Sequence, residues 1–308
     1  MRTVKIYFSP TGNTKRIVDA VASSTDLNGE STIDLDITLP DSRKNFNYHA
    51  QDGDVVIIGM PVYAGRIPNL LLPFIKTITP FSAGSSKVIS CIPVVTYGGR
   101  NYDDALIELA DILEDNGFNV LAAGAFIAEH SFSSKICNSL PDKDSLSFAA
   151  RLGRLAIGKG SSEGKESVGF SIGVGNIKGM EGREGKVSGV FEEFRRNEIF
   201  VGKQNIKGRE KEERVYYRPR FADGSPINML KVKPKTKENC LRCGICAKRC
   251  PMGSISASDP TVITGPCIKC NRCVRECKVG AKYFDDAGYL FHVSDLERMV
   301  GNGYNLVK

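Results

Sequence analysis

Short apolar runs alternate with helical patterns through the first 160 residues of the chain. The apolar runs predict strands at Thr3–Phe8, Ser31–Ile37, Val55–Gly59, Lys87–Val95 and Val120–Ile127. Between them, a period near 3.6 residues predicts helices at Thr14–Ser24, Pro68–Thr77, Tyr102–Asn116 and Asp144–Ile157. This alternation is typical of a parallel sheet with crossover helices, so we expect a doubly wound α/β domain with a five-stranded parallel sheet over residues 1–158.

The pattern changes after residue 158. Residues 158–189 contain ten glycines in 32 positions, far above the ordinary usage of about 7%, and charge runs follow between Lys203 and Arg220. We expect residues 159–233 to form a connector or insertion with loops or short hairpins. The stretch from Phe191 to Lys237, which includes these charge runs, is interpreted as a solvated and partly flexible connector, and a docking surface for an acidic redox partner is the alternative.

The composition narrows the class of protein. The chain has 308 residues, of which 41% are hydrophobic and 25% charged, as in ordinary globular proteins. No apolar run approaches the roughly 20 residues of a membrane helix, and no secretory signal core is visible. We therefore expect a cytoplasmic protein with no membrane partner.

The formal net charge of +7 is confined to the second half of the chain. Residues 1–160 hold 15 Lys and Arg against 17 Asp and Glu, residues 161–235 hold 16 against 11, and residues 236–308 hold 11 against 7. Thiolate-bound clusters in the last segment would offset its excess, because the charge of a bound metal group must be counted. We expect no nucleic-acid partner.

Eight of the ten cysteines lie close together in the last segment. The spacing C-x2-C-x2-C-x3-C occurs twice, 27 residues apart, at Cys240, Cys243, Cys246 and Cys250 and again at Cys267, Cys270, Cys273 and Cys277. Such clustering indicates a local metal site in a reducing compartment. Three closely spaced thiolates suit three irons of one cubane, whereas a pair of four-cysteine zinc sites fits the spacing poorly.

This repeat resembles the bacterial two-cluster ferredoxins, in which the fourth cysteine of each run ligates the other cluster. The resemblance implies a small α+β domain over residues 234–286, followed by a C-terminal tail with a short helix over 287–308. It implies one [4Fe-4S] cluster held by Cys240, Cys243, Cys246 and Cys277, and a second held by Cys267, Cys270, Cys273 and Cys250. Lys278 stands where the family has a proline, which leaves ligation intact. Exposed cubanes are labile to oxygen, which favours an anaerobic setting.

The segment Ser9-Pro10-Thr11-Gly12-Asn13-Thr14 directly follows the first predicted strand and opens the first predicted helix. Amides at a helix N-terminus, with hydroxyls beside them, suit a phosphate; an ordinary capped turn is the alternative. The segment resembles the S/T-x-T-G-N-T phosphate loop of flavodoxins. That resemblance implies an FMN whose phosphate is bound by Ser9, Thr11, Gly12, Asn13 and Thr14.

Doubly wound sheets bind ligands at the carboxyl ends of their strands. We therefore expect the loops after the third and fourth strands to flank the flavin, through Pro61, Val62, Tyr63, Ala64 and Gly65 and through Thr96, Tyr97, Gly98 and Gly99. Arg66 and Arg100 are candidates to balance a reduced flavin, with ordinary surface arginines as the alternative. His130 follows the fifth strand and is a candidate for proton transfer, with a plain loop histidine as the alternative.

Together, the two halves resemble the flavodoxin-ferredoxin fusion proteins of anaerobic bacteria and archaea. The resemblance implies an iron–sulfur flavoprotein that passes single electrons between two [4Fe-4S] clusters and FMN, from a ferredoxin-like donor or a reductase to an acceptor at the flavin, which can be a small molecule. Two alternatives stay open: a pure electron carrier for a protein partner, and a flavin-dependent quinone or NAD(P)H reductase. No separate nicotinamide-binding module is visible in the sequence.

Overall fold

Five parallel strands form the centre of the N-terminal region. The computed structural model describes residues 2–25, 32–44, 46, 48–80, 88–158, 168–171 and 196–301. The parallel strands run in the order β2-β1-β3-β4-β6. This is the flavodoxin-like order of a doubly wound sheet. The bounds are β1 (Arg2–Tyr7), β2 (Ile33–Asp36), β3 (Asp54–Pro61), β4 (Ser90–Tyr97) and β6 (Ala122–Ile127), and β5 (Asn119–Val120) pairs with the start of β4. The prediction of five parallel strands is confirmed.

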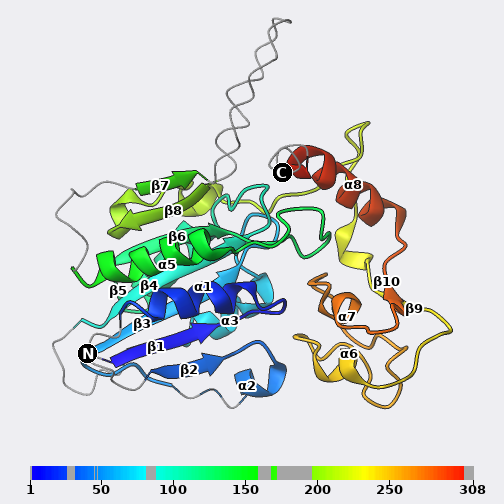
Figure 1. Ribbon diagram of the computed structural model, residues 1–308, viewed down its shortest axis with the longest axis horizontal. Helices are drawn as coiled ribbons and strands as arrows, with labels where there is room; N and C mark the ends of the chain where they lie inside the picture. The colour runs from blue at the N-terminus through cyan, green and yellow to red at the C-terminus, as the bar shows by residue number, and fades with distance from the viewer. Residues whose placement is uncertain are drawn as a thin grey trace, which may run out of the picture.

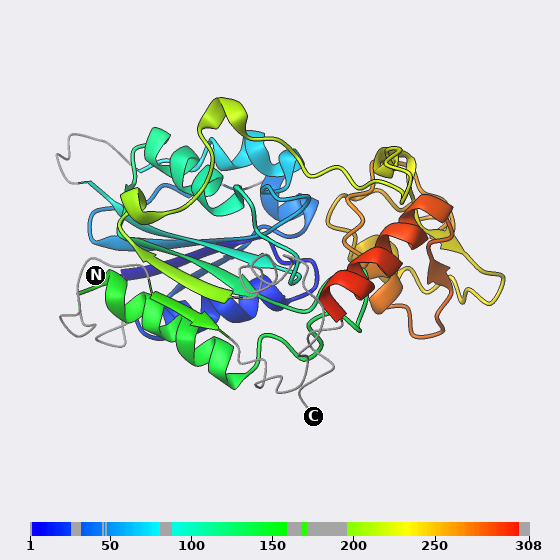
Figure 2. The same cartoon turned by 90° about the horizontal axis from the view of Figure 1, so that it is seen from above.

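Helices cover both faces of this sheet (Figure 2). On one face, α1 (Asn13–Ala22) and α5 (Lys143–Ala156) bury apolar side chains such as Val18 and Leu152 against Ile57. On the other, α3 (Leu72–Ile75), preceded by the 3-10 turn Asn69–Leu71, and α4 (Ala105–Asp115) bury residues such as Leu109 against Ile58. The short helix α2 (Pro40–Lys44) was not predicted.

Two antiparallel strands extend the sheet beyond β6. β8 (Arg196–Val201) pairs with β6, and β7 (Val168–Ser171) pairs with β8. The structure thus differs from the expected solvated connector, because Ile199 and Phe200 are at most 1% exposed and belong to the core. Most of the glycine-rich stretch lies outside the described residues. After β8 the chain continues through the 3-10 turns Lys203–Asn205, Lys211–Glu213 and Met229–Lys231.

The cysteine region consists of very short elements at the carboxyl ends of the parallel strands (Figure 1). It holds α6 (Ile245–Lys248), α7 (Arg272–Arg275) and the antiparallel pair β9 (Lys235–Thr236) and β10 (Lys282–Tyr283). The tail helix is present as α8 (Ala287–Gly301). No helix in the described part of the chain is long and apolar enough to cross a membrane.

Candidate functional site

The loop between β1 and α1 leaves several backbone amides open. Gly12 caps α1 with φ of 88°, a left-handed conformation that glycine adopts without strain. Within the described ranges, no acceptor lies against the amides of Thr11, Asn13 and Thr14. Open amides at a helix N-terminus are suited to an anion. The loop therefore has the local geometry that its sequence indicated.

The hydroxyl groups of this loop are used to shape it. The Ser9 hydroxyl accepts a hydrogen bond from the Lys15 amide at 3.0 Å. The Thr14 hydroxyl lies 2.7 Å from the Thr96 hydroxyl, and both side chains are buried. The Asn13 side-chain amide reaches the Glu129 carbonyl at 3.4 Å. These contacts join the ends of β1, β4 and β6 in one edge.

The loop after β3 is held in a tight turn. Val62 donates its amide to the Thr96 carbonyl at 2.8 Å, and Tyr63 and Arg66 bond each other through their backbones. Ala64 and Gly65 both have positive φ, at 53° and 77°. The Pro61, Val62 and Tyr63 side chains are half-buried, and the Ala64 carbonyl accepts from the Tyr217 amide at 2.8 Å. The loop is thus fixed from both sides.

The loop after β4 packs against the loop that follows β6. Tyr97 is 4% exposed and meets Tyr102 edge to face, with ring centroids 5.4 Å apart. A Cβ on Gly98 would overlap the imidazole of His130, and one on Gly99 would overlap the Cys137 sulfur. The close approach of the two loops therefore requires glycine at both positions, independently of any other contact that the backbone makes there.

The two candidate arginines each have a carboxylate partner. Arg66 forms a bidentate pair with Glu108 at 2.8 and 2.5 Å, and its guanidinium lies 5.1 Å from the Tyr216 ring. Arg100 pairs with Asp103 and lies 4.1 Å from the ring of Tyr217. Their charges are therefore largely compensated within the chain. Sequence reasoning did not anticipate the two tyrosines, because they come from the connector.

His130 is neutral at neutral pH. Burial lowers the pKa of His130 to about 3, and His292, Arg275 and Arg100 add to the shift. Its Nδ1 accepts from the Phe132 amide at 3.1 Å. A neutral ring of this kind can donate a hydrogen bond from Nε2, but it carries no proton to release as an imidazolium.

The cysteine region repeats its backbone conformation with the same 27-residue offset as its sequence. Positive φ occurs at Arg242, Gly244 and Gly253 and again at Lys269, Asn271 and Gly280. The Lys282–Thr236 pairing of β10 with β9 recurs 27 residues away as the bridge between Ile255 and Ile263. The amides of Ser254 and Ala281 point at the sulfurs of Cys250 and Cys277, at 3.4 and 3.2 Å.

The cysteines of the second predicted cluster lie around one apolar cavity. We call this group the inner set: Cys250, Cys267, Cys270 and Cys273. The cavity wall also includes Met252, Ile255, Ile263, Ile268 and Phe284. The Lys269 amide points at the Cys267 sulfur at 3.3 Å. Four thiols, apolar walls and N–H groups aimed at sulfur are what a cubane requires, so these residues fit the group.

The other four cysteines, which we call the outer set, are Cys240, Cys243, Cys246 and Cys277. Burial opposes ionisation of Cys277, but the amides of Lys282 and Ala281 hold the pKa of this thiol below its usual value. Cys243 is exposed, whereas Cys270, its counterpart in the repeat, is 7% exposed. Within the described ranges, no group of three or more His, Cys, Asp or Glu side chains is arranged to hold a single metal ion.

The inner set lies against the edge that carries the loops. Burial raises the pKa of Tyr63, and the sulfurs of Cys270 and Cys267 raise it further. Ile268, between those two cysteines, packs against the core of the sheet. The candidate flavin loop after β3 and the inner cysteine set are therefore neighbours.

Two arginines tie the regions together. Arg43, at the end of α2, donates to the Pro251 carbonyl at 2.6 Å. Arg275, on α7, donates to the Glu129 carboxylate at 2.5 Å, to the His130 carbonyl at 2.6 Å and to the Ser131 carbonyl at 3.2 Å. No local sequence signal could have identified these contacts, since their partners are 144 to 208 residues away.

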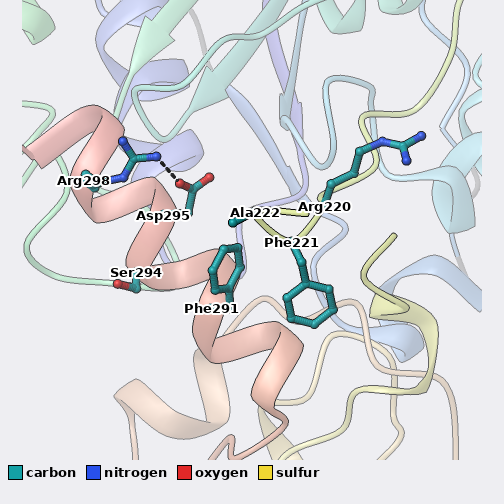
Figure 3. Close-up of a pocket in the computed structure, with 7 residues that line it drawn as sticks. All are labelled: Arg220, Phe221, Ala222, Phe291, Ser294, Asp295 and Arg298. Atoms are coloured by element: carbon teal, nitrogen blue, oxygen red, sulfur yellow. Dashed lines mark hydrogen bonds and ion pairs between the residues drawn. The ribbon is translucent and has the colours of Figure 1, made fainter. Parts of the chain in front are cut away.

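A further pocket lies beside α8, lined by Arg220, Phe221, Ala222, Phe291, Ser294, Asp295 and Arg298 (Figure 3). Its two guanidinium groups are both engaged: Arg298 bonds Asp295 at 2.6 Å and Arg220 bonds the Gly224 carbonyl at 2.7 Å. None of the residues that the sequence singled out lines it. The chemistry of the chain is therefore concentrated at the sheet edge and the cysteine sets.

Comparison with solved structures finds likeness to flavodoxins over about half of the chain. No protein-family model and no curated protein matches the chain. Among solved structures, a flavodoxin from Bacillus cereus is 16% identical with a TM-score of 0.36, and covers 51% of this chain and 97% of its own. A Megasphaera elsdenii flavodoxin is 17% identical with a TM-score of 0.33 and covers 51% and 99%. The rubredoxin:oxygen oxidoreductase of Desulfovibrio gigas is 15% identical with a TM-score of 0.32 and covers 51% and 34%. The strand order, rather than these likenesses, defines the fold as flavodoxin-like.

Proposed function

We propose that this chain is an electron-transfer iron–sulfur flavoprotein that passes single electrons between two [4Fe-4S] clusters and FMN. The observation that carries the proposal is the position of the inner cysteine set at the sheet edge, where Ile268 packs against the core and Arg43 bonds the Pro251 carbonyl at 2.6 Å. FMN accepts one or two electrons and each cubane one, so a chain that binds both can link the two kinds of transfer.

The residues that would hold FMN come from three loops at the carboxyl edge. The open amides of Thr11, Asn13 and Thr14 would bind the phosphate without a cationic side chain. Pro61–Gly65 and Thr96–Gly99 would flank the ring. Because Arg66 and Arg100 are paired with carboxylates, backbone groups would make most of the polar contacts to the ring.

The two cysteine sets differ in their access to solvent. Cys270 of the inner set is buried and Cys243 of the outer set is exposed, and the other six cysteines are half-buried. This order suits entry of electrons at the outer set from a ferredoxin-like donor and delivery at the flavin.

A pure electron carrier is the second candidate function. The enzymatic version depends on groups that could act on a small substrate, and the candidates were His130, Arg66 and Arg100. The structure gives both arginines carboxylate partners and leaves His130 neutral. This arrangement favours a carrier that exchanges electrons with proteins at both ends.

The test is quantification of iron, acid-labile sulfide and FMN in protein purified without oxygen. We expect about eight irons, eight sulfides and one FMN per chain. Cys267→Ser should remove about half of the iron, because it takes one ligand from the inner set only. Cys91→Ala, in the core of β4, is the matched control and should leave the iron unchanged. Zinc in place of iron, or absence of FMN, would refute the proposal.

A further inference from the structure

The internal repeat gives the cysteine region two similar faces, of which the rest of the chain covers one. On the covered face, the Pro251 carbonyl accepts from Arg43, and Ile268 packs into the core of the sheet. Pro251 is buried and Cys270 is 7% exposed. This face is therefore the surface by which the cysteine region docks on the sheet edge.

The residues 27 positions away form the same surface on the other side, and they are exposed. Leu241, the counterpart of Ile268, is 72% exposed. Lys278, the counterpart of Pro251, and Cys243, the counterpart of Cys270, are exposed as well. A Cβ on Gly280 would meet nothing within 4 Å. We call this surface, formed by Leu241, Arg242, Cys243, Lys278 and Val279, the outer face.

An exposed leucine beside a cofactor ligand is unusual for a surface with no partner. Val279, 38% exposed, is tied to the segment before Leu241 by a hydrogen bond from Asn239 to its carbonyl at 3.0 Å. The outer face therefore presents two apolar side chains next to Cys243, the one exposed cysteine of the two sets. Apolar contacts ringed by charge are typical of protein docking sites.

The charge of the outer face indicates the kind of partner. Lys237, Arg242, Lys248 and Lys278 are all exposed, and the acids beside them are Glu238 and Asp259, whose carboxylate lies 3.8 Å from Arg242. These four cations outnumber the two acids, and the charge of about −2 that a bound cubane with its thiolates would add brings the face close to neutral. The repeat favours an acidic partner, because Arg275 of the cysteine region meets Glu129 of the sheet edge and its counterpart 27 positions away, Lys248, is exposed.

We propose that the outer face is the docking site for an acidic, ferredoxin-type electron-transfer protein, which binds it as the sheet edge binds the covered face. The proposal rests on the proposed function and deepens it by locating the donor. In the docked complex one electron leaves the reduced partner, which is oxidised, and enters this chain, which is reduced by one. No bond is made or broken and no proton moves.

The test uses the cofactor-loaded full chain and a purified, negatively charged two-[4Fe-4S] ferredoxin as the probe. Binding is measured by isothermal titration without oxygen at low and high salt. We expect Leu241→Glu to weaken binding at least tenfold, because it puts a carboxylate at the centre of the face, and high salt to weaken wild-type binding. Val88→Glu is the matched control: Val88 is 67% exposed just before β4 begins, at the opposite end of the strand, and its variant should bind within twofold of wild type.

Three results would overturn the docking site. The ferredoxin does not bind the wild-type chain, both variants bind alike, or Leu241→Glu instead abolishes self-association of the chain and leaves ferredoxin binding unchanged. Iron and FMN are assayed on each sample. Full cofactor content without binding refutes only the docking site, whereas missing cofactors refute the proposed function. If Leu241→Glu fails to load iron, the double variant Lys248→Glu/Lys278→Glu replaces it, with the same expected loss.

Discussion

The sheet region and the cysteine region are held together by different means. In the sheet, strand residues such as Val56, Ile57 and Ile58 are fully buried between two layers of helices, which is characteristic of a parallel sheet. In the cysteine region, α6 and α7 have four residues each, and β9 and β10 have two. Elements so short supply little apolar burial, and a region of this size needs metals or another brace. The first region is a scaffold, and we expect the second to depend on a bound group.

Removal of iron should separate the two regions most clearly. Chelation under anaerobic conditions is expected to unfold residues 234–286, because ligand binding and folding are coupled in small metal-bound domains. Hydrogen exchange followed by mass spectrometry should show complete exchange there within minutes, while β3 and β4 remain protected. Equal protection of both regions after iron removal would show that the cysteine region has a sufficient core of its own.

Ile58→Ala should act on the sheet alone. Ile58 is fully buried, and removal of its side chain is expected to lower the free energy of unfolding by about 2–5 kcal/mol. Urea unfolding followed by far-UV circular dichroism gives the value. Val262→Ala in the cysteine region, where the side chain is 48% exposed, is the control and should change it by less than about 0.5 kcal/mol. A similar loss of unfolding free energy in both variants would contradict the distinction between the sheet region and the cysteine region.

Arg275→Ala should loosen the contact between the regions without unfolding either. It removes a carboxylate pair and two hydrogen bonds to carbonyls, and we expect docking to weaken by about 1–2 kcal/mol. Faster hydrogen exchange at residues 129–132 reports it. Arg298→Ala breaks an exposed pair within α8 and should leave this exchange unchanged, since such pairs contribute little. Unchanged hydrogen exchange in both variants would show that Arg275 does not hold the two regions together.

Mild acid should destabilise the junction itself. Burial lowers the pKa of His130 to about 3 and that of His292 to about 4, from a usual value of about 6.5. At a pH between the usual value and these lowered pKa values, both histidines bind protons in the unfolded chain but not in the folded chain. The stability of the fold should therefore decrease as the pH drops below about 6.5.

Unfolding measured at pH 7 and pH 5 should show this loss, and His130→Gln/His292→Gln should reduce it. The Phe132 ring contacts both histidines, which places them between the β6 loop and α8. An unchanged pH dependence in the double variant would mean that other groups titrate.

The sequence predicted the elements whose signals are local. Alternation of apolar runs identified the five parallel strands, and the cysteine spacing identified a repeat that the backbone conformation follows. β8 was missed because its apolar run, Ile199–Val201, is short and stands between a glycine-rich stretch and a charge run. The Glu108 partner of Arg66 and the contacts of Arg275 depend on tertiary structure and leave no local pattern, whereas the partner of Arg100, Asp103, is only three residues away. Whether Tyr97 and Gly98 contact a flavin stays a prediction. The packing of Tyr97 against Tyr102 and of Gly98 against His130 is already a sufficient reason for these two residue types.

A reductive titration of the anaerobic, cofactor-loaded chain tests the central claim most directly. If one chain binds FMN and two cubanes in electronic contact, it should accept about four electrons, two at the flavin and one at each cluster. Acceptance of only two electrons, with the absorbance change confined to the flavin, would contradict the account. The cysteine repeat would then be a structural region without a role in electron transfer.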